Sequence, residues 1–210
     1  MSRTFRLRTP LSEREVRRLK AGDVVYLSGR VVTARDAAHK RMLNLIEAGR
    51  PLPINLHGLP IYHCGPLVRK ENGRWTVLAA GPTTSMRMEP FESKVIERLG
   101  VRMVIGKGGM GAKTANAMAK FGAVYGAFTG GAAVLAARNI TRVIDVEWLN
   151  LGIPEALWVL EVKDFGPLIV ALDSHGNNLF REVNEKAWER YRSALQRRGA
   201  QKNLKGEGTL

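Results

Sequence analysis

The sequence predicts an α/β protein, and two observations support this prediction. Residues 101–122 have the pattern of a short buried strand, a glycine-rich turn and a helix, and residues 123–139 repeat the same scheme. Apolar residues on either side of this region recur with the period of strands or of helices. Alternating elements of these lengths are typical of an α/β layer. A chain of 210 residues, without an internal repeat or a Pro- or Ser-rich linker, is expected to form one domain.

The N-terminal half is expected to open with a short basic helix and a strand. Ser12 and Glu15 fit a capping box, which predicts a helix to about Lys20, closed by Gly22. Alternating residues over 24–35 predict a strand. The further elements expected in this half are a helix over 36–49, strands over 59–68 and 74–82 that flank a turn, and a helix over 89–100.

The C-terminal half adds strands and a long helix. After the two strand–helix units, residues 142–151 and 156–174 are expected to be strands, followed by a turn at 175–178. Residues 181–199 have the pattern of a final helix. Residues 200–210 are expected to be a flexible tail, so that the predicted domain spans residues 1 to 199.

The formal net charge of +14 is concentrated at the two ends of the chain. Such a charge raises the possibility of nucleic-acid binding. The sequence has no RNP-type aromatic signature, no zinc spacing and no clear helix-turn-helix, and its few aromatic residues are scattered. These features disfavour nucleic-acid binding. The basic ends are expected to be a solvated face or a surface that docks an acidic partner.

The chain has the features of a cytoplasmic protein. No apolar run approaches the roughly 20 residues of a membrane-spanning helix, and the N-terminus lacks the apolar core of a signal peptide. Cys64 is the one cysteine, so no internal disulfide can form, and it is expected to be a small buried residue rather than a nucleophile. The four histidines do not have the spacing of metal ligands, so we expect no metal site at them. They are His39, His57, His63 and His175.

The stretch VIGKGGMGAKTANAMAKFG, residues 104–122, has some of the features of a phosphate-binding loop. That loop requires a glycine, four residues and then Gly-Lys-Ser/Thr. Gly106 and Gly111 have this spacing, but Ala112 stands where the lysine belongs. A glycine turn before a helix still offers backbone N–H groups to an anion such as a carboxylate, with Lys107 as a mobile charge. The alternative is a tight turn whose glycines only permit close packing.

Two further segments carry candidate carboxylate ligands. In GPTTSMRM, Thr83 and Thr84 follow a predicted strand, and Arg87 comes shortly after them. Hydroxyl groups beside a guanidinium suit a carboxylate, which arginine can bind bidentately. The alternative is that the threonines satisfy backbone groups of the loop. In TARDAAH, Arg35 and Asp36 open a predicted helix, where the aspartate needs no other role.

In this order and spacing, the segments TARDAAH, GPTTSMRM and VIGKGGM resemble the β subunit, or C-terminal domain, of class I fumarases and the related tartrate dehydratases. The resemblance runs from about residue 22 to residue 180 and leaves out the basic C-terminal helix and tail. It implies an α/β fold of the swivelling β/β/α type, a single domain of mixed sheet layers with packed helices.

The resemblance implies a hydro-lyase that adds water reversibly across the double bond of a small dicarboxylate, in the first place fumarate, giving L-malate. L-Tartrate or a methylated dicarboxylate stays an alternative substrate. Enzymes of this family use a [4Fe–4S] cluster, whose ligands are cysteines. A chain with one cysteine is expected to leave the cluster to a cysteine-bearing α subunit, in an α2β2 assembly with a shared active site. The alternative from another class is a basic nucleic-acid-binding or scaffold protein.

The same resemblance assigns roles to single residues. Thr83 falls at the position of the catalytic base, and Lys107 is expected to act beside it. A threonine hydroxyl is a weak base, so Thr83 is expected to need neighbouring cations and a carboxylate from the other subunit. The glycine loop becomes a carboxylate-binding turn. The residues expected to bind the substrate are Arg35, Thr84, Arg87, Lys107 and Gly108.

Overall fold

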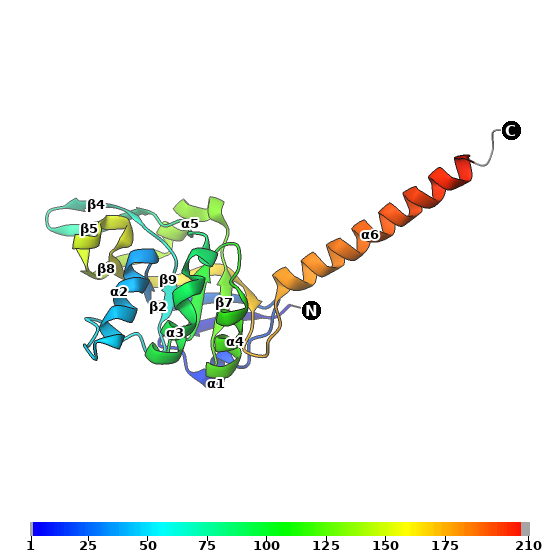
Figure 1. Ribbon diagram of the computed structural model, residues 1–210. Helices are drawn as coiled ribbons and strands as arrows, with labels where there is room; N and C mark the ends of the chain where they lie inside the picture. The colour runs from blue at the N-terminus through cyan, green and yellow to red at the C-terminus, as the bar shows by residue number, and fades with distance from the viewer. Residues whose placement is uncertain (1, 207–210) are drawn as a thin grey trace. The chain divides into compact units, whose positions relative to one another are not determined.

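Figure 1 presents the computed structural model, which describes the backbone of residues 2–206 and the side chains of residues 2–195. The chain divides into two compact units, Met1–Asn177 and Asn178–Leu210. The first unit is a mixed α/β domain with a sheet and packed helices, as the sequence predicts.

A sheet of seven strands forms the centre of the first unit, in the order β1-β2-β3-β6-β7-β9-β8. β2, β3, β6 and β7 are parallel neighbours, so their carboxyl ends lie at one edge of the sheet. β9 pairs antiparallel with both β2 and β7, which closes these strands into a ring. The strands are β1 (Thr4–Arg8), β2 (Val24–Thr33), β3 (Pro60–Tyr62), β6 (Met103–Gly106), β7 (Val124–Ala127), β8 (Ile140–Glu147) and β9 (Leu157–Leu172).

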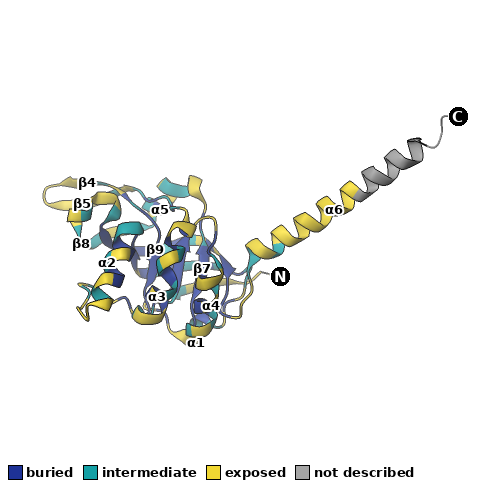
Figure 2. Cartoon of the chain, in the orientation of Figure 1, coloured by how far each residue is buried: buried dark blue, intermediate teal, exposed yellow. Residues whose placement is uncertain are grey.

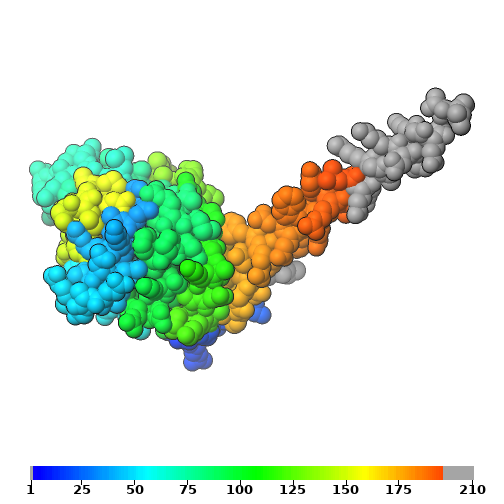
Figure 3. Space-filling view, viewed as in Figure 1, coloured from blue at the N-terminus to red at the C-terminus, as the bar shows by residue number. Residues whose placement is uncertain are grey.

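Three helices, α2 (Asp36–Glu47), α3 (Glu89–Leu99) and α4 (Ala112–Phe121), cover one face of the sheet (Figures 1 and 3). α3 lies between the other two and packs against both. Each helix is amphipathic and buries the apolar side that faces the strands. The remaining elements of this unit are the hairpin β4 (Leu67–Glu71) and β5 (Arg74–Ala79), the short helices α1 (Glu13–Val16) and α5 (Ala133–Arg138), and the 3-10 turns η1 (Ser85–Met88), η2 (Gly130–Ala132), η3 (Leu149–Leu151) and η4 (Ile153–Glu155).

The core lies against the central strands, which are the most deeply buried elements in Figure 2, namely β2, β3, β6, β7 and β9. The ring of Tyr62 packs edge-on against that of Phe165, with 5.3 Å between the ring centroids. The ring of Phe128 also lies 5.3 Å from that of Phe165. Trp158 of β9 packs edge-on against Trp75 of the hairpin, with 5.1 Å between ring centroids. Burial of such large apolar rings is the main stabilising contribution of a core of this kind.

The first unit departs from the sequence prediction in three places. No sequence pattern predicts β1, because this edge strand pairs with β2 alone among the named strands and has no buried residue to mark it. The helix predicted to reach Lys20 ends at Val16, although its capping box is confirmed. The Lys20 N–H donates instead to the Asp23 carboxylate, at 2.8 Å. The strand predicted over 59–68 divides into β3 and β4, because Gly65 and Pro66 turn the chain out of the sheet.

In the described residues of the second unit there is one helix, α6 (Leu179–Gly206). The sequence predicts this helix over residues 181–199; it begins two residues earlier and continues past residue 199. The segment expected to be a tail, residues 200–210, is therefore helical up to Gly206, and residues 207–210 lie outside the described residues. Of the helices in the described part of the chain, none combines the length and apolar character that crossing a bilayer requires.

Candidate functional site

The site predicted from the sequence assembles where the parallel strands end. Arg35 follows β2, Lys107 follows β6, and Gly130 follows β7. The segment Thr83–Ser85 lies beside the end of β6 and belongs to the connection from β5 to α3. The carboxyl ends of β2, β3, β6 and β7 meet at one edge, so the loops that leave them bring these residues together.

Backbone hydrogen bonds hold the threonine turn against Lys107. The Lys107 N–H donates to the Thr83 carbonyl at 3.3 Å, and the Ser85 N–H donates to the Lys107 carbonyl at 2.9 Å. These bonds make a short parallel bridge between Thr84 and Lys107. The Thr83 N–H donates in turn to the His63 carbonyl at 2.6 Å. Thr83 keeps its side chain partly exposed, and its hydroxyl makes none of the hydrogen bonds found among the described residues.

Arg35 is oriented by Glu155 of η4. Its Nε lies 3.2 Å from a Glu155 carboxylate oxygen, and its side chain is only 22% exposed. The other oxygen of Glu155 accepts the N–H of Ala37 at 2.9 Å, so the same carboxylate also caps the start of α2. A guanidinium nitrogen of Arg35 lies close to Gly65, 2.8 Å from where a β-carbon at this glycine would stand. The Arg35 side chain is therefore confined on two sides.

Arg87 pairs with Asp36, the residue next to Arg35. Two of its guanidinium nitrogens contact the two carboxylate oxygens of Asp36, at 2.7 and 3.1 Å. The Arg87 side chain is 51% exposed, so this fork-like pair contributes little to stability. It does bring the turn η1 against the start of α2, where Arg35 is the residue before the first helical turn.

Lys107 is the candidate cation without an internal counter-charge. Over residues 2–195, its ammonium forms no ion pair with a carboxylate, whereas Arg35 and Arg87 each have one. The side chain is exposed and extends over Gly130, with Nζ 3.7 Å from where a β-carbon at Gly130 would lie. The next residue, Gly108, is exposed with a φ of +80°, a conformation that favours glycine.

The structure corrects the expectation that the start of α4 is open to an external anion. The side chain of Glu89, at the start of α3, already occupies it. Its carboxylate accepts the N–H of Gly111 at 2.7 Å, of Lys113 at 3.1 Å and of Thr114 at 3.2 Å. A helix N-terminus with free N–H groups favours a negative charge, and here that charge is the protein's own. An external carboxylate can therefore meet Lys107 and Gly108, but not the helix N-terminus behind them.

Comparison with known proteins decides the family. The model of the family described as Fumarase C-terminus matches residues 1–183. The chain belongs to the fumarase C-terminus family.

Relatives in this family cover most of the chain. The L(+)-tartrate dehydratase subunit beta of Escherichia coli (strain K12) is 48% identical over 90% of this chain and 92% of that protein. A putative L(+)-tartrate dehydratase subunit beta of Methanocaldococcus jannaschii is 44% identical over 86% of this chain and 93% of that protein. A putative fumarate hydratase class I of Geobacillus stearothermophilus is 46% identical over 90% of this chain, which matches 36% of that longer protein. These relatives are hydro-lyases, and this chain is a hydro-lyase component.

Behind the site, this fumarase C-terminus domain contains a buried polar network that no motif in the sequence indicates. It consists of His39 of α2, His63 after β3, Ser85 of η1, Glu92 of α3 and Tyr125 of β7, all of them buried. The five residues come from separate elements and share no spacing in the sequence. A buried glutamate on the inner face of α3 is the one local signal that could have been found, since an unpaired charge is costly there.

The electrostatics of this network follow from burial and one shared carboxylate. Burial alone raises the pKa of Glu92, but the charge and hydrogen bonds of His39 and His63 lower it to about 2. Burial depresses the pKa of His39, yet the neighbouring Glu92 carboxylate raises it above the ordinary value. For His63, burial prevails and its pKa is lowered. The pKa values of the two imidazoles are thus shifted in opposite directions although both rings contact Glu92.

The one thiol of the chain does not suit an iron–sulfur cluster. Cys64 is fully buried, and burial raises its pKa to about 12. A cluster needs several cysteine thiolates, and this thiol stays protonated and inaccessible. The described residues of this domain therefore do not fit the cluster that the family resemblance implies.

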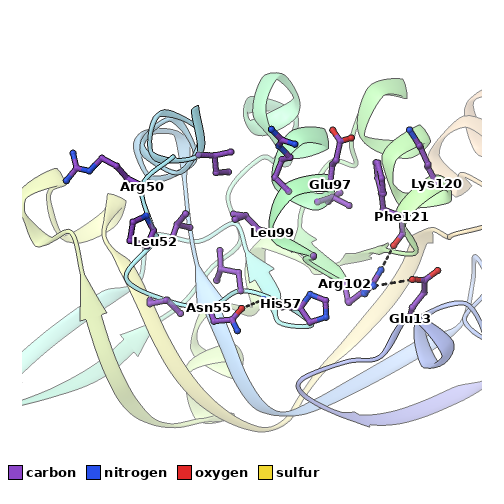
Figure 4. A pocket seen from close by; sticks show the side chains of 17 residues that line it. Glu13, Arg50, Leu52, Asn55, His57, Glu97, Leu99, Arg102, Lys120 and Phe121 are labelled. Atoms are coloured by element: carbon purple, nitrogen blue, oxygen red, sulfur yellow. Dashed lines mark hydrogen bonds and ion pairs between the residues drawn. The ribbon is translucent and has the colours of Figure 1, made fainter. Parts of the chain in front are cut away.

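A recess of about 730 Å³ opens at the opposite edge of the parallel strands (Figure 4). It is lined by residues before β3 and β6 and at the ends of α3 and α4, including His57, Arg102 and Phe121. The Arg102 guanidinium donates to the Gly122 carbonyl at 3.0 Å and to the Glu13 carboxylate at 3.2 Å, so it closes the end of α4. No predicted site residue lines this recess, which we regard as a structural feature rather than the substrate site.

Proposed function

We propose that this chain is the β subunit of a two-subunit hydro-lyase that hydrates fumarate reversibly to L-malate. The observation that supports this most directly is the exposed ammonium of Lys107, which lies beside the Thr83–Ser85 turn and forms no ion pair within residues 2–195. Two guanidinium groups, those of Arg35 and Arg87, stand on the neighbouring loop and turn. Three cations on segments next to the partly exposed Thr83 suit a dianionic substrate better than a neutral one.

In this proposal the chain binds one substrate carboxylate and stabilises negative charge. Loss of a proton from the carbon next to a carboxylate spreads charge onto the carboxylate oxygens, and fixed cations lower the barrier to that step. Lys107 would meet this charge, with Arg35, Thr84, Arg87 and Gly108 fixing the orientation of the substrate. Thr83 would take the proton at its hydroxyl oxygen, activated by the cations and by a carboxylate of the partner subunit.

The proposal assigns the [4Fe–4S] cluster to a cysteine-bearing α subunit, because the single thiol of this chain is buried. When bound there, the cluster would supply a Lewis acid for the hydroxyl that leaves or enters. The names of the relatives, tartrate dehydratase subunit beta, support a partner of this kind. An α2β2 assembly, a cytoplasmic location and the swivelling β/β/α architecture complete the proposal.

Exposed apolar side chains on segments next to the predicted site residues are available to such a partner. They lie on η1, which also carries Arg87, on α5, which follows the turn at Gly130, and on η4, which carries Glu155. They are Met86, Val134, Leu135 and Ile153. Exposed apolar groups gathered around polar ones are typical of protein interfaces.

L-Tartrate is the second candidate substrate, and one observation favours it. Relatives of the same length as this chain carry the name L(+)-tartrate dehydratase subunit beta, whereas the fumarate hydratase relative is a much longer protein. Both substrates are four-carbon dicarboxylates, and the same cations suit both.

Anaerobic reconstitution with the cysteine-bearing subunit tests the proposal. We expect fumarate hydration, or tartrate dehydration, in the mixture and in neither subunit alone. The Thr83→Ala and Lys107→Ala variants should lose turnover, and Lys113→Ala, which removes an exposed lysine of α4, should retain it. Tight assembly without activity on either substrate would contradict the proposal. Salt-sensitive binding to arbitrary duplex DNA, unchanged in Lys107→Ala, would favour a nucleic-acid-binding protein instead.

A further inference from the structure

The buried network connects both sides of the proposed site through a series of short contacts. The Arg35 carbonyl lies 2.8 Å from His39 Nδ1, and His39 Nε2 lies 2.9 Å from Glu92 Oε2. The same Oε2 lies 2.9 Å from His63 Nε2. His63 Nδ1 lies 2.9 Å from the Ser85 hydroxyl. The network thus begins at the backbone of one site arginine and ends in the threonine turn.

The protons of the network can be assigned from its donors and acceptors. Glu92 is a carboxylate and accepts only, so both imidazoles donate to it from Nε2. His39 Nδ1 faces a carbonyl, which also only accepts, so His39 must donate from both nitrogens and is an imidazolium. One carboxylate balances one buried positive charge, and a second imidazolium would have no counter-charge in the network. His63 is therefore neutral, and its Nδ1 accepts from the Ser85 hydroxyl.

His63 contacts the threonine turn at both ends. Its carbonyl accepts the Thr83 N–H at 2.6 Å, and its ring accepts the Ser85 hydroxyl at 2.9 Å. The Tyr125 hydroxyl also donates to the Ser85 oxygen, at 2.9 Å. Between these two anchors, the backbone of Thr83 and Ser85 makes the bonds that hold Lys107. A change in the His63 ring is therefore expected to reach Thr83 and Lys107 through these hydrogen bonds and the backbone of the turn.

We propose that His63 is a positioning residue for the Thr83–Ser85 turn, and that His39 and Glu92 keep it in the neutral form protonated at Nε2. This form presents an acceptor to Ser85. Because the network is neutral overall, it supports the cationic site without adding charge to it. His63 does not touch the substrate in this arrangement; it fixes residues that do.

A metal site is the alternative for His39, His63 and Glu92, since their donor atoms lie within 4.8 Å of one another. The geometry disfavours this. Zinc lies about 2.0–2.1 Å from imidazole nitrogen, with no proton between them, whereas each Nε2 here lies at hydrogen-bond distance from the carboxylate. One atom, Glu92 Oε1, has no hydrogen-bond partner among the described residues. A metal assay is therefore part of the test.

Two substitutions of His63 separate its two contacts. In His63→Asn, a side-chain oxygen can take the place of Nδ1 and accept from Ser85, but the contact with Glu92 is lost. In His63→Gln, an amide can take the place of Nε2 and donate to Glu92, but the contact with Ser85 is lost. Ser85→Ala removes the same contact from the other side. Val16→Ala, in the buried side of α1, is the control for a general loss of stability.

The first readout uses the full chain and does not depend on activity. Nitrogen-15 spectra of the histidines should identify His39 as doubly protonated and His63 as protonated at Nε2 alone. Hydrogen exchange at the amides of Lys107 and Ser85 should become at least 10-fold faster in His63→Gln and Ser85→Ala than in Val16→Ala, with His63→Asn closer to wild type. Equal exchange in all four variants, or a stoichiometric metal bound through both imidazoles, would overturn the proposal.

The second readout is turnover in the assembly with the α subunit, and it rests on the proposed function. Misplacement of reacting groups by about 1 Å can cost up to about 100-fold in rate. We expect kcat of His63→Gln to fall by about 10- to 100-fold with a much smaller change in KM, and kcat of Val16→Ala to stay near wild type. An active wild-type assembly with unchanged kcat in His63→Gln would overturn the positioning role. An inactive wild-type assembly would contradict the proposed function and leave the exchange result to decide the positioning role.

Discussion

The contact between Glu89 and the start of α4 allows a stability prediction with a worked magnitude. The Glu89→Gln substitution keeps the shape of the side chain and removes its charge. In the folded protein the two carboxylate oxygens accept three backbone N–H groups, one on Oε2 and two on Oε1. An amide has one oxygen, so at least one of these N–H groups would face an NH2 group and lose its acceptor.

Two contributions to the free energy of unfolding are then lost. A charge at a helix N-terminus stabilises by about 0.3–1 kcal/mol. A buried or half-buried N–H that loses its acceptor costs about 1–3 kcal/mol. We therefore expect Glu89→Gln to lower the free energy of unfolding by about 2 kcal/mol, which for a domain of this size is a fall in Tm of about 4–8 °C.

Thermal unfolding followed by circular dichroism measures this effect, with Glu97→Gln as the matched control. Glu97 is exposed on the same helix and makes no ion pair among the described residues, so its substitution should change the free energy of unfolding by less than about 0.5 kcal/mol. Equal Tm values for the two variants would refute the reasoning. In addition, Glu89→Ala frees the three N–H groups, so inorganic phosphate should raise the Tm of this variant more than that of Glu97→Ala.

The remaining predictions concern the site and the network behind it. Lys107→Ala should reduce kcat/KM of the assembled enzyme by about 100- to 1,000-fold, because a fixed cation at the developing charge is lost; an unchanged kcat/KM, or tight magnesium-dependent nucleotide binding by the wild type, would contradict this. Gly65→Ala should raise KM. The added methyl group would lie 2.8 Å from a guanidinium nitrogen of Arg35 and 2.7 Å from a carbonyl oxygen of η4, so that one of these groups must move. An unchanged KM in steady-state kinetics would show that the methyl group is accommodated. The contribution of the buried imidazoles to the free energy of unfolding should be greatest near pH 6.5, which is the ordinary pKa of histidine. Below pH 6.5, the unfolded state binds a proton at residue 63, whereas folded His63 does not, because its pKa is lowered. Above pH 6.5, folded His39 keeps a proton that the unfolded state loses, because its pKa is raised. Urea unfolding between about pH 5 and 8 should therefore lose its acid-side decline in His63→Gln and its alkaline-side decline in His39→Gln, and profiles parallel to wild type in both variants would contradict the assignment.

Much of the fold could be predicted from local sequence. Strand–turn–helix units are encoded by short apolar runs, glycines and amphipathic periodicity, which act over a few residues. The capping box at Ser12 and Glu15 is an example, since its contacts are made within one helical turn. The edge strand β1 could not be predicted, because its half-exposed residues are ordered mainly by pairing with β2.

The site follows the same division. The residue types and their order marked Thr83, Arg87 and Lys107 as candidates, because hydroxyl groups and cations at the ends of strands can be recognised from the sequence. Their closeness depends on the parallel order of β2, β3, β6 and β7, which is set by long-range pairing. The pairing of each cation, in particular the absence of a counter-charge at Lys107 within residues 2–195, also depends on that packing.

The sequence by itself determined most of the helices and strands, the excess of positive charge, the single cysteine and the motifs that resemble the fumarase C-terminus family. Only the tertiary structure decided that Glu89 occupies the start of α4 and that His39, His63 and Glu92 meet in the core. The physical reason is that burial and electrostatic pairing depend on distances of a few ångströms between residues that lie tens of positions apart in the chain. Local patterns carry no information on those distances, since they are fixed when the sheet and its helices pack.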